Sequence, residues 1–351
     1  MPFRDIVGHR HLLDLVAGAA TRSSLPPSLI FAGPEGVGKR AAALALAQLV
    51  NCPTPVQSSD PATPDRLSQD LATPDRLIND ACGTCASCTR IARLVHADVF
   101  LVEPGDTGVI KIDQVREAVE RTAYRPFEGR RRVVIVDEAD AMLSEAQNAL
   151  LKTLEEPPSA SMFVLVSSRP DELLPTVRSR CQRLRFGRLS TGDIAAVLMQ
   201  AHDFSSSDAH AAAAAADGSI GLALEGGATA LVEAREAAAG VLSHVAGTRD
   251  PRRRLESGKV LLGGGDRDEL RRRLRALASM VRDLGVIGVG APAINERYLA
   301  NADLEEPLRR LAGSFDRERV SFAFAAIDRA LEAIDRNASP KIVADWLAFQ
   351  L

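Results

Sequence analysis

The stretch GPEGVGKR (residues 33–40) decides the fold class of this chain. Loops that wrap around nucleotide phosphates read G-x-x-x-x-G-K-[ST], because the glycines let backbone N–H groups approach the phosphates and the lysine adds a positive charge. Gly33, Gly38 and Lys39 match this pattern, but Arg40 stands where the pattern has the hydroxyl that binds Mg²⁺. The loop therefore indicates a nucleotide-binding domain and raises the question of whether the chain still hydrolyses ATP.

The sequence around the loop alternates between apolar runs and helical patterns. SLIFAG (28–33) leads into the loop and KRAAALALAQLVNC (39–52) leaves it with helix-forming Ala and Leu, in the order strand, loop, helix. Continuous Val, Ile and Leu runs that alternate with helices indicate a parallel α/β sheet. Further strands are expected at 98–104, within 131–142 and at 162–168. Helices are expected at 110–124 and from residue 144 to a stop at Pro157 and Pro158.

The character of the chain changes after about residue 187. Strand-like runs give way to Ala- and Leu-rich helical patterns, interrupted by loop signals such as DGSIG (217–221). The segment 266–284 repeats Leu and Val at helical spacing, and Ser339 followed by Pro340 is typical of the start of a final helix. We therefore predict an α/β domain followed by two all-helical pieces.

A tandem repeat stands apart from the rest of the chain. DPATPDRLSQ (60–69) and DLATPDRLIN (70–79) are nearly identical and rich in Pro, Asp and Ser. Two copies cannot stack into a solenoid, so we interpret residues 53–81 as an inserted surface loop and assign the repeat no function.

Length and composition place the chain among ordinary globular proteins. Its 351 residues favour two or three domains, and 46% of them are hydrophobic and 25% charged. The sequence has no uncharged apolar run of about 18 residues, and MPFRDIVGHR (1–10) lacks the layout of a signal peptide, so we expect a cytoplasmic protein without membrane contact. The net charge of −3 argues against a dedicated polyanion binder.

Four cysteines form the candidate metal site. CGTCASC places Cys82, Cys85 and Cys88 at two-residue intervals, and Cys52 ends the helix that follows the nucleotide loop. Four thiolates suit tetrahedral Zn²⁺ and leave no open position for catalysis, which favours a structural zinc. Free thiols and an iron–sulfur cluster are the alternatives. Cys181 stands alone and is interpreted as an ordinary buried or half-buried thiol.

Two acids complete the candidate nucleotide site. VVIVDEAD ends a buried strand with Asp137, which could orient the water shell of Mg²⁺, and Glu138, which could polarise an attacking water. The alternative is that these acids only cap a strand. The backbone N–H groups of residues 36–40, Gly36 included, could hold a phosphate without any side chain. The sequence therefore leaves open whether the chain binds ATP and Mg²⁺. Efficient hydrolysis is not expected, because Arg40 replaces a ligand of Mg²⁺.

Arginines beyond the last predicted strand offer a second kind of site. Arg180, in RSRC (178–181), could project to the γ-phosphate of a neighbouring subunit as an arginine finger, although a lone surface arginine is commoner. EGRRR (128–132) is a basic run on an expected loop, which we interpret as a solvated turn in preference to a grip on DNA phosphates.

These motifs, in this order, resemble the clamp-loader subunits of bacterial DNA polymerase III, within the AAA+ family. The resemblance rests on FAGPEGVGK, the four cysteines, HADVFLVEP, IKIDQVRE, VVIVDEADAM, NALLKTLEEPP and SRPDELLPTVRSRCQRLRF, which span nearly all of residues 1–187. DGSIGLAL and SPKIVADWLAFQL extend it more loosely into the helical remainder.

The resemblance implies an AAA+ P-loop domain at 1–187, a small helical lid at 188–230 and an all-α collar at 231–351 that assembles subunits into a ring. It implies a hetero-oligomer with tau/gamma and delta subunits, indirect contact with the sliding clamp, and primer–template DNA as a partner of the whole complex. It also gives Arg180 the role of acting in trans on the ATP of an adjacent motor subunit.

The departures from the family pattern point to a non-motor member. Motor subunits carry an arginine in the lid pattern G-S-x-R, whereas this chain has Gly221 at that position, and Arg40 replaces the loop hydroxyl. The alternatives are an ATP-hydrolysing tau/gamma-type subunit, an AAA+ DNA-repair or plasmid ATPase, and a zinc-stabilised scaffold unrelated to replication.

Overall fold

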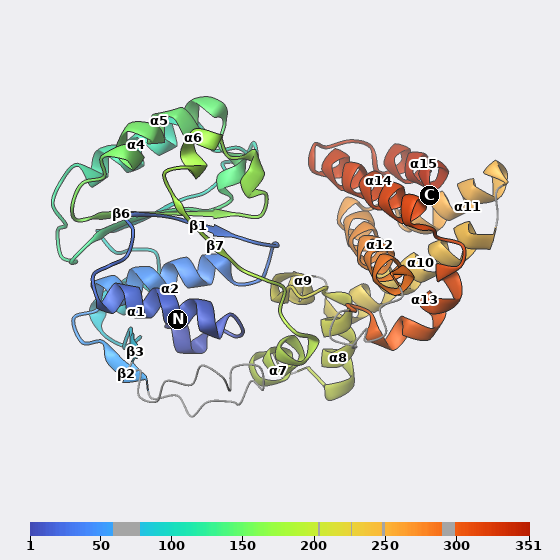
Figure 1. Cartoon of the computed structure of the whole chain (residues 1–351), viewed down its shortest axis with the longest axis horizontal. Coiled ribbons are helices and arrows are strands. Elements are labelled where there is room, and N and C mark those ends of the chain that lie inside the picture. Colours follow the sequence, from blue (N-terminus) through green and yellow to red (C-terminus); the bar gives the residue numbers. More distant parts are fainter. Residues whose placement is uncertain (59–77, 203, 226, 248–249, 290–298) are drawn as a thin grey trace. The chain divides into compact units, whose positions relative to one another are not determined.

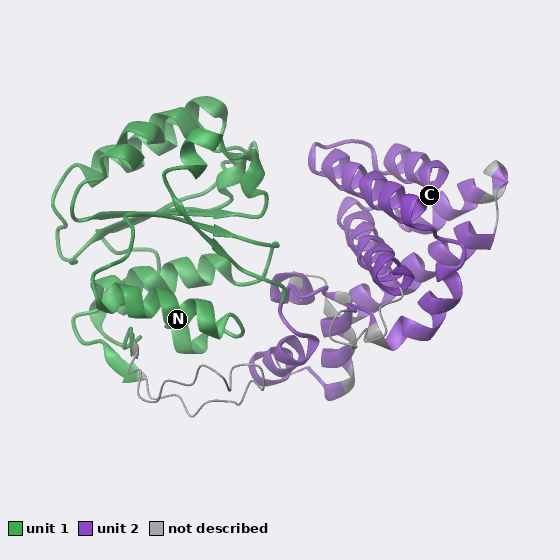
Figure 2. Cartoon of the chain, in the orientation of Figure 1, with its two compact units in different colours: residues 1–188 green, residues 189–351 purple. Residues whose placement is uncertain are grey.

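The computed structural model describes residues 1–58, 78–202, 204–225, 227–247, 250–289 and 299–351. The chain divides into two compact units, Met1–Arg188 and Leu189–Leu351 (Figure 2). The tandem repeat at 60–79 falls outside the described residues except for its last two positions.

The first unit is built on a parallel sheet, which confirms the predicted α/β class. Each neighbouring pair of strands in this sheet runs parallel. The described strands lie in the order β4 (Val99–Val102), β5 (Arg132–Val136), β6 (Ser161–Ser167), β1 (Ser28–Ala32) and β7 (Gln182–Arg185).

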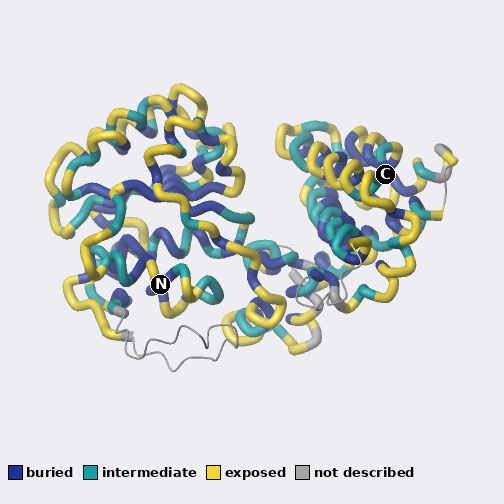
Figure 3. The backbone as a smooth tube through the Cα atoms, viewed as in Figure 1, coloured by how far each residue is buried: buried dark blue, intermediate teal, exposed yellow. Residues whose placement is uncertain are grey.

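Helices cover both faces of this sheet, as Figure 1 shows. Side chains alternate between the faces along each strand. In β1, Leu29 and Phe31 pack against the helices on one face, and Ile30 packs against those on the other. Every residue of β1 and β6 is buried, and so is every residue of β5 after the first (Figure 3). One face carries α1 (Arg10–Thr21), α2 (Lys39–Asn51) and α3 (Ala86–Ala92), and the other carries α4 (Ile112–Thr122), α5 (Ser144–Glu155) and α6 (Pro175–Arg178).

The inserted segment begins and ends in a two-stranded antiparallel hairpin. β2 (Val56–Ser58) pairs with β3 (Ile78–Asp80). Asp80 is buried, and its carboxylate accepts the N–H groups of Phe3 at 3.1 Å and Arg4 at 3.0 Å. The base of the insertion is therefore tied to the amino-terminal segment of the first unit.

The second unit is all-helical in its described residues, as the sequence predicts. Leu270, Leu274 and Leu277 lie on one buried face of α12. Ser339 stands at the N-cap of α15, but its side chain makes no capping hydrogen bond. The helices are α7 (Thr191–Ala201), α8 (Ser206–Ala215), α9 (Ile220–Glu225), α10 (Gly227–Gly247), α11 (Pro251–Leu262), α12 (Arg267–Gly288), α13 (Glu305–Ala312), α14 (Arg317–Asp335) and α15 (Pro340–Gln350).

Two separate apolar cores lie inside the second unit. The first core spans Leu189 to Leu231 and the second spans Ala238 to Leu351. Among the described helices of the whole chain, none has the length and apolarity to span a bilayer.

Candidate functional site

The nucleotide loop joins β1 to α2 at the carboxyl edge of the sheet. Gly36 and Gly38 adopt positive φ angles of 68° and 97°, a backbone conformation that favours glycine. Gly33 is required for a different reason, because a Cβ there would lie 2.2 Å from the backbone oxygen of Phe186. The predicted strand–loop–helix arrangement is confirmed by β1 and α2 on either side of the loop.

Lys39 is the first residue of α2 and is only 6% exposed. Its Nζ donates hydrogen bonds to the carbonyl oxygens of Gly33 at 2.7 Å and Pro34 at 2.5 Å. Burial lowers the pKa of Lys39, and the carboxylates of Asp140, Glu35 and Asp137 act against that change. The ammonium group is thus folded back into its own loop.

Arg40 connects the loop helix to the acidic edge of the sheet. Its Nη1 donates to Asp137 Oδ2 at 3.1 Å and also forms an ion pair with Glu103. These two acids follow β5 and β4, respectively. The structure therefore places the nucleotide loop beside Asp137, as the sequence predicts, and it adds two ion pairs of Arg40, with Asp137 and with Glu103, that were not predicted.

Three acids follow β5 closely. Burial raises the pKa of Asp137 in spite of Arg40, and burial and then Asp137 raise the pKa of Glu138. Asp140 is different, since burial is outweighed by hydrogen bonds: Ser167 Oγ donates to it at 2.6 Å, and the pKa of Asp140 is lowered. Asp140 thus holds the end of β6 beside the candidate nucleotide site.

Arg180 lies just after α6, at the surface of the first unit. Its side chain is 33% exposed and forms an ion pair with Glu155 at the end of α5. Its Nη1 also donates to the carbonyl oxygen of Thr176 at 2.9 Å. Cys181, the next residue, is buried as predicted, and burial raises the pKa of its thiol to about 12.

The four cysteines come together as predicted. Their sulfur atoms all lie within 4.8 Å of one another, with Cys52 Sγ 4.0 Å from Cys85 Sγ and Cys82 Sγ 3.9 Å from Cys88 Sγ. Tetrahedral Zn²⁺ with Zn–S bonds of about 2.3 Å would separate its sulfur ligands by about 3.8 Å. The residues present therefore fit a four-thiolate metal.

Backbone N–H groups also point at the sulfurs. Cys82 N, Cys85 N and Cys88 N donate to the sulfurs of Cys52, Cys82 and Cys85 at 3.4, 3.3 and 3.4 Å. Burial raises the pKa of the Cys52 and Cys88 thiols. At Cys82 burial acts in the same direction, but N–H donors outweigh it and lower the pKa to about 5. The N–H groups favour thiolates, the form that binds metals.

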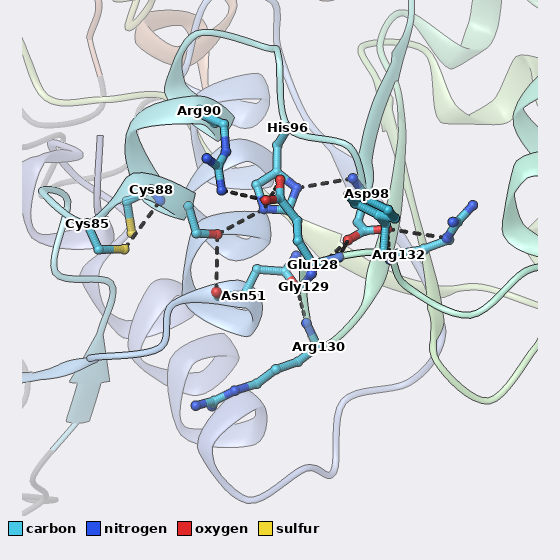
Figure 4. Close-up of polar contacts among 12 residues, drawn as sticks. Asn51, Cys85, Cys88, Arg90, His96, Asp98, Glu128, Gly129, Arg130 and Arg132 are labelled. Carbon is cyan, nitrogen blue, oxygen red and sulfur yellow. Dashed lines mark hydrogen bonds and ion pairs between the residues drawn. The ribbon is translucent and has the colours of Figure 1, made fainter.

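A buried polar network extends from this cluster to the loop at 127–131 (Figure 4). Asp98, which is fully buried, accepts the N–H groups of Phe127 at 2.7 Å, Glu128 at 2.8 Å and Gly129 at 2.7 Å. Asn51 Oδ1 accepts the next two N–H groups, of residues 130 and 131, at 2.8 and 2.9 Å. Two side chains thus hold five consecutive backbone donors.

The same network contacts α3, which contains Cys88 and has Cys85 as its N-cap. Ser87 Oγ donates to Asn51 O at 3.2 Å and lies 3.0 Å from His96 Nε2 (Figure 4). His96 Nδ1 accepts the N–H of Asp98 at 3.1 Å, so the ring proton is on Nε2, facing Ser87. Burial lowers the pKa of His96 against the opposing effect of the Glu128 and Asp98 carboxylates, and so favours the neutral ring. Asn51 precedes Cys52, and Ser87 lies between Cys85 and Cys88. The network that holds the loop at 127–131 therefore includes direct sequence neighbours of the cysteines.

Several of these residues were not assigned a role by sequence reasoning. Glu103 and Asp98 stand at the two ends of one predicted strand, where an acid is an ordinary solvated residue. Their partners are between 29 and 63 positions away along the chain, so no local pattern reveals them. The signal that could have pointed to Asp98 is its neighbour His96, a second polar residue next to a buried strand.

Replacing Cys85 with serine is expected to release one bound metal and to speed amide exchange at residues 50–58, 78–92 and 127–131. The sheet should stay folded, because the cluster fastens an excursion outside the core. Elemental analysis and hydrogen-exchange mass spectrometry measure both effects. Cys181→Ser is the matched control and should keep the metal. Iron in the purified protein, or no metal after purification without chelator, would refute a zinc site.

The fold and the nucleotide loop together define the class of protein. A parallel sheet in the order β4-β5-β6-β1-β7, a glycine-rich loop after β1 and acids after β5 form a P-loop domain of the AAA+ type. The chain belongs to the family described as "DNA polymerase III, delta subunit", whose sequence model matches residues 8–190, more than half of the 351 residues.

Curated relatives carry names from the same polymerase. The DNA polymerase III subunit delta' of Pseudomonas aeruginosa is 37% identical over 150 residues, which is 42% of this chain and 39% of that protein. The DNA polymerase III subunit tau of Bacillus subtilis is 29% identical over 189 residues, covering 54% of this chain and 30% of that protein. The gamma/tau subunit of Mycobacterium tuberculosis is 31% identical over 196 residues, covering 56% and 30%. The matches span well under half the length of these relatives.

The solved structures that match most of the chain have lower sequence identity to it. A DNA polymerase III gamma subunit-related protein of Thermotoga maritima is 18% identical with a TM-score of 0.44, covering 95% of this chain and 97% of that one. The RuvB Holliday junction branch migration motor of the same organism is 16% identical with a TM-score of 0.41, covering 89% and 90%.

Proposed function

We propose that this chain is the non-motor, delta-prime subunit of the DNA polymerase III clamp loader. The observation that carries the proposal is the ion pair of Arg40 with Asp137, because it puts a fixed side-chain cation where an ATPase needs Mg²⁺. Gly221 in α9, where motor subunits carry a lid arginine, supports the same reading. Family membership and the delta' relative support the choice of complex.

In this proposal the chain works as part of a cytoplasmic hetero-oligomer. Its partners are the tau/gamma and delta subunits, with the sliding clamp contacted indirectly and primer–template DNA bound by the assembled complex. The chain helps to load the clamp for a DNA-directed DNA polymerase and presents Arg180 to the ATP of a neighbouring subunit. The four cysteines hold a structural Zn²⁺, which supplies no chemistry.

We further propose that the second unit consists of a lid at 188–230 and a collar at 231–351. Its two separate apolar cores support a division near this boundary, because the first core ends at Leu231 and the second begins at Ala238. The collar would supply the contacts that join the subunits into a ring.

Mixing the chain with tau/gamma and delta subunits of the same organism is expected to give a stable complex that contains one copy of this chain. Native mass spectrometry measures the composition. The isolated chain should hydrolyse ATP negligibly, and Arg40→Thr alone should not restore turnover because Gly221 remains. Failure to join the complex would exclude the proposal.

A second candidate is an ATP-hydrolysing subunit of the tau/gamma type or a related AAA+ DNA-repair ATPase. The tau and gamma/tau relatives, which cover more of this chain than the delta' relative does, favour it. Turnover of the isolated chain near the lower end of ordinary enzymes, about 1 s⁻¹, would support this alternative.

A further inference from the structure

A guanidinium group lies where the nucleotide loop of an ATPase meets its magnesium ion. Mg²⁺ in such sites is bound by the hydroxyl that follows the loop lysine and by the acid at the end of a neighbouring strand. In this chain Arg40 replaces the hydroxyl and pairs with that acid, Asp137, at 3.1 Å. Its ion pair with Glu103 joins a second strand end to the same cation.

These side chains do not fit Mg²⁺. The ion demands nearly octahedral coordination by oxygen atoms at about 2.0–2.1 Å and gives up its water reluctantly. Arginine offers no oxygen and its charge cannot be removed by deprotonation. A magnesium ion would have to displace the guanidinium from Asp137 and then remain beside a like charge.

The same guanidinium suits a phosphate directly. Its planar fork of donors matches the oxygens of a phosphate, and its charge is the sign that a metal would supply. Only 14% of the Asp137 side chain is exposed, whereas 42% of the Arg40 side chain is exposed, so the cation has an open side. Lys39, next to it, provides a second positive charge that is now satisfied by carbonyl oxygens of the loop.

We propose that Arg40 replaces the divalent cation of this site, and that the loop binds a nucleoside diphosphate or another polyphosphate without any divalent metal. The Lys39 ammonium would donate its hydrogen bonds to the phosphates in place of the loop carbonyls. The Arg40 guanidinium would pair with the phosphates and with Asp137 at the same time. The proposal rests on the proposed function, in which residues 33–40 are a nucleotide loop. It goes beyond that function by naming Arg40 as the group that neutralises the charge of the phosphates.

The test measures binding of fluorescently labelled ADP to the whole chain, with excess EDTA and again with millimolar Mg²⁺. The wild type should bind with the same dissociation constant, within about twofold, in both conditions, and unlabelled pyrophosphate should compete in EDTA. Arg40→Thr should bind at least about tenfold more tightly with Mg²⁺ than with EDTA, because it regains a metal ligand and loses the built-in charge. Lys39→Ala should bind in neither condition, and Arg116→Thr, which removes an exposed arginine of α4, should behave as the wild type does.

Three results would overturn the proposal: tighter wild-type binding with Mg²⁺ by about tenfold or more, no wild-type binding in EDTA, or the same metal response in Arg40→Thr as in the wild type. The proposed function does not require this ligand for assembly with the other subunits. A failure here with a complex of unchanged mass would therefore leave the proposed function standing.

Discussion

Arg180→Ala is expected to lower the DNA- and clamp-stimulated ATPase of the reconstituted complex while this chain remains folded, metal-loaded and assembled. The reason is that the proposed partner charge of Arg180 lies on a neighbouring subunit's nucleotide. Within the chain the guanidinium contacts only surface groups, chiefly Glu155 and the carbonyl of Thr176, among the contacts described. An exposed ion pair of this kind contributes about 0–1 kcal/mol, so the folded chain should tolerate its loss.

The size of the effect follows from the number of ATP sites. Arginine fingers in related phosphate-transfer sites contribute about 10³–10⁵-fold to the rate. Only one site of a ring would lose its finger, so the total ATPase should fall by much less than this. Clamp loading should fall more steeply than the ATPase if the sites act together. Arg180→Lys should not restore either rate, because an ammonium cannot reproduce the planar fork.

Arg178→Ala is the matched control for this experiment. Arg178 lies two residues earlier, has a similarly exposed side chain (35% against 33%) and pairs with Asp171. It should leave both rates near those of the wild type. Wild-type ATPase and loading for Arg180→Ala, with normal assembly, would make Arg180 an ordinary surface arginine and remove the trans-acting role.

Local patterns were sufficient to predict four of the five described strands of the parallel sheet and the helices α2, α4 and α5 of the first unit. Val, Ile and Leu runs indicated the positions of β1, β5 and β6, because a strand buried on both faces consists mostly of apolar residues. β7 was not predicted as a strand, and its sequence QRLR shows why: it is an edge strand with mostly exposed side chains. Strand order depends on contacts between distant segments, and no local pattern encodes it.

Among the candidate sites, too, some features could be predicted from local sequence patterns and others could not. The cysteine cluster could be predicted because three of its members lie within seven residues and metal chemistry restricts the spacing. The closeness of the nucleotide loop to Asp137 followed from two motifs that nucleotide chemistry places together, whereas the ion pair of Arg40 with Asp137 was not predicted. The role of Asp98 could not be predicted, since its ligands are backbone N–H groups, and every residue except proline has one.

Replacing Asp98 with asparagine is expected to destabilise the first unit and to release the loop at 127–131. A carboxylate accepts at both of its oxygens, whereas an amide has one acceptor and would turn an NH₂ group toward N–H donors. Hydrogen bonds to a charged group contribute about 1.5–3 kcal/mol each, so losing one bond, removing the charge from the others and facing an NH₂ group with an N–H donor predict about 3–5 kcal/mol in total. Asn51 cannot compensate, because its Oδ1 already accepts two N–H groups. The same oxygen packs so closely on the loop that a Cβ added at Gly129 would lie 2.5 Å from it.

Hydrogen exchange at residues 124–132 measures this effect in the first unit. The fluorescence of Trp346, the one tryptophan of the chain, reports on α15 in the second unit and checks that the change is local. Asp113→Asn provides a charge-matched control, since that side chain is 89% exposed on α4, and its stability should stay within about 0.5 kcal/mol of the wild type.

The destabilisation should also depend on pH, with a sign fixed by the pKa of Asp98. Burial alone would raise this pKa, but the N–H groups of the loop and the guanidinium of Arg132 outweigh burial and hold it below its ordinary value of 3.8. A carboxylate with a lowered pKa in the folded state stabilises the fold fully above its unfolded-state pKa and progressively less as the pH falls toward the folded-state pKa. The stability difference between the wild type and Asp98→Asn should therefore be constant near neutral pH and narrow below about pH 4. A difference that stays unchanged through this range, or loop exchange equal to that of the wild type, would mean that the Asp98 charge does not hold the loop.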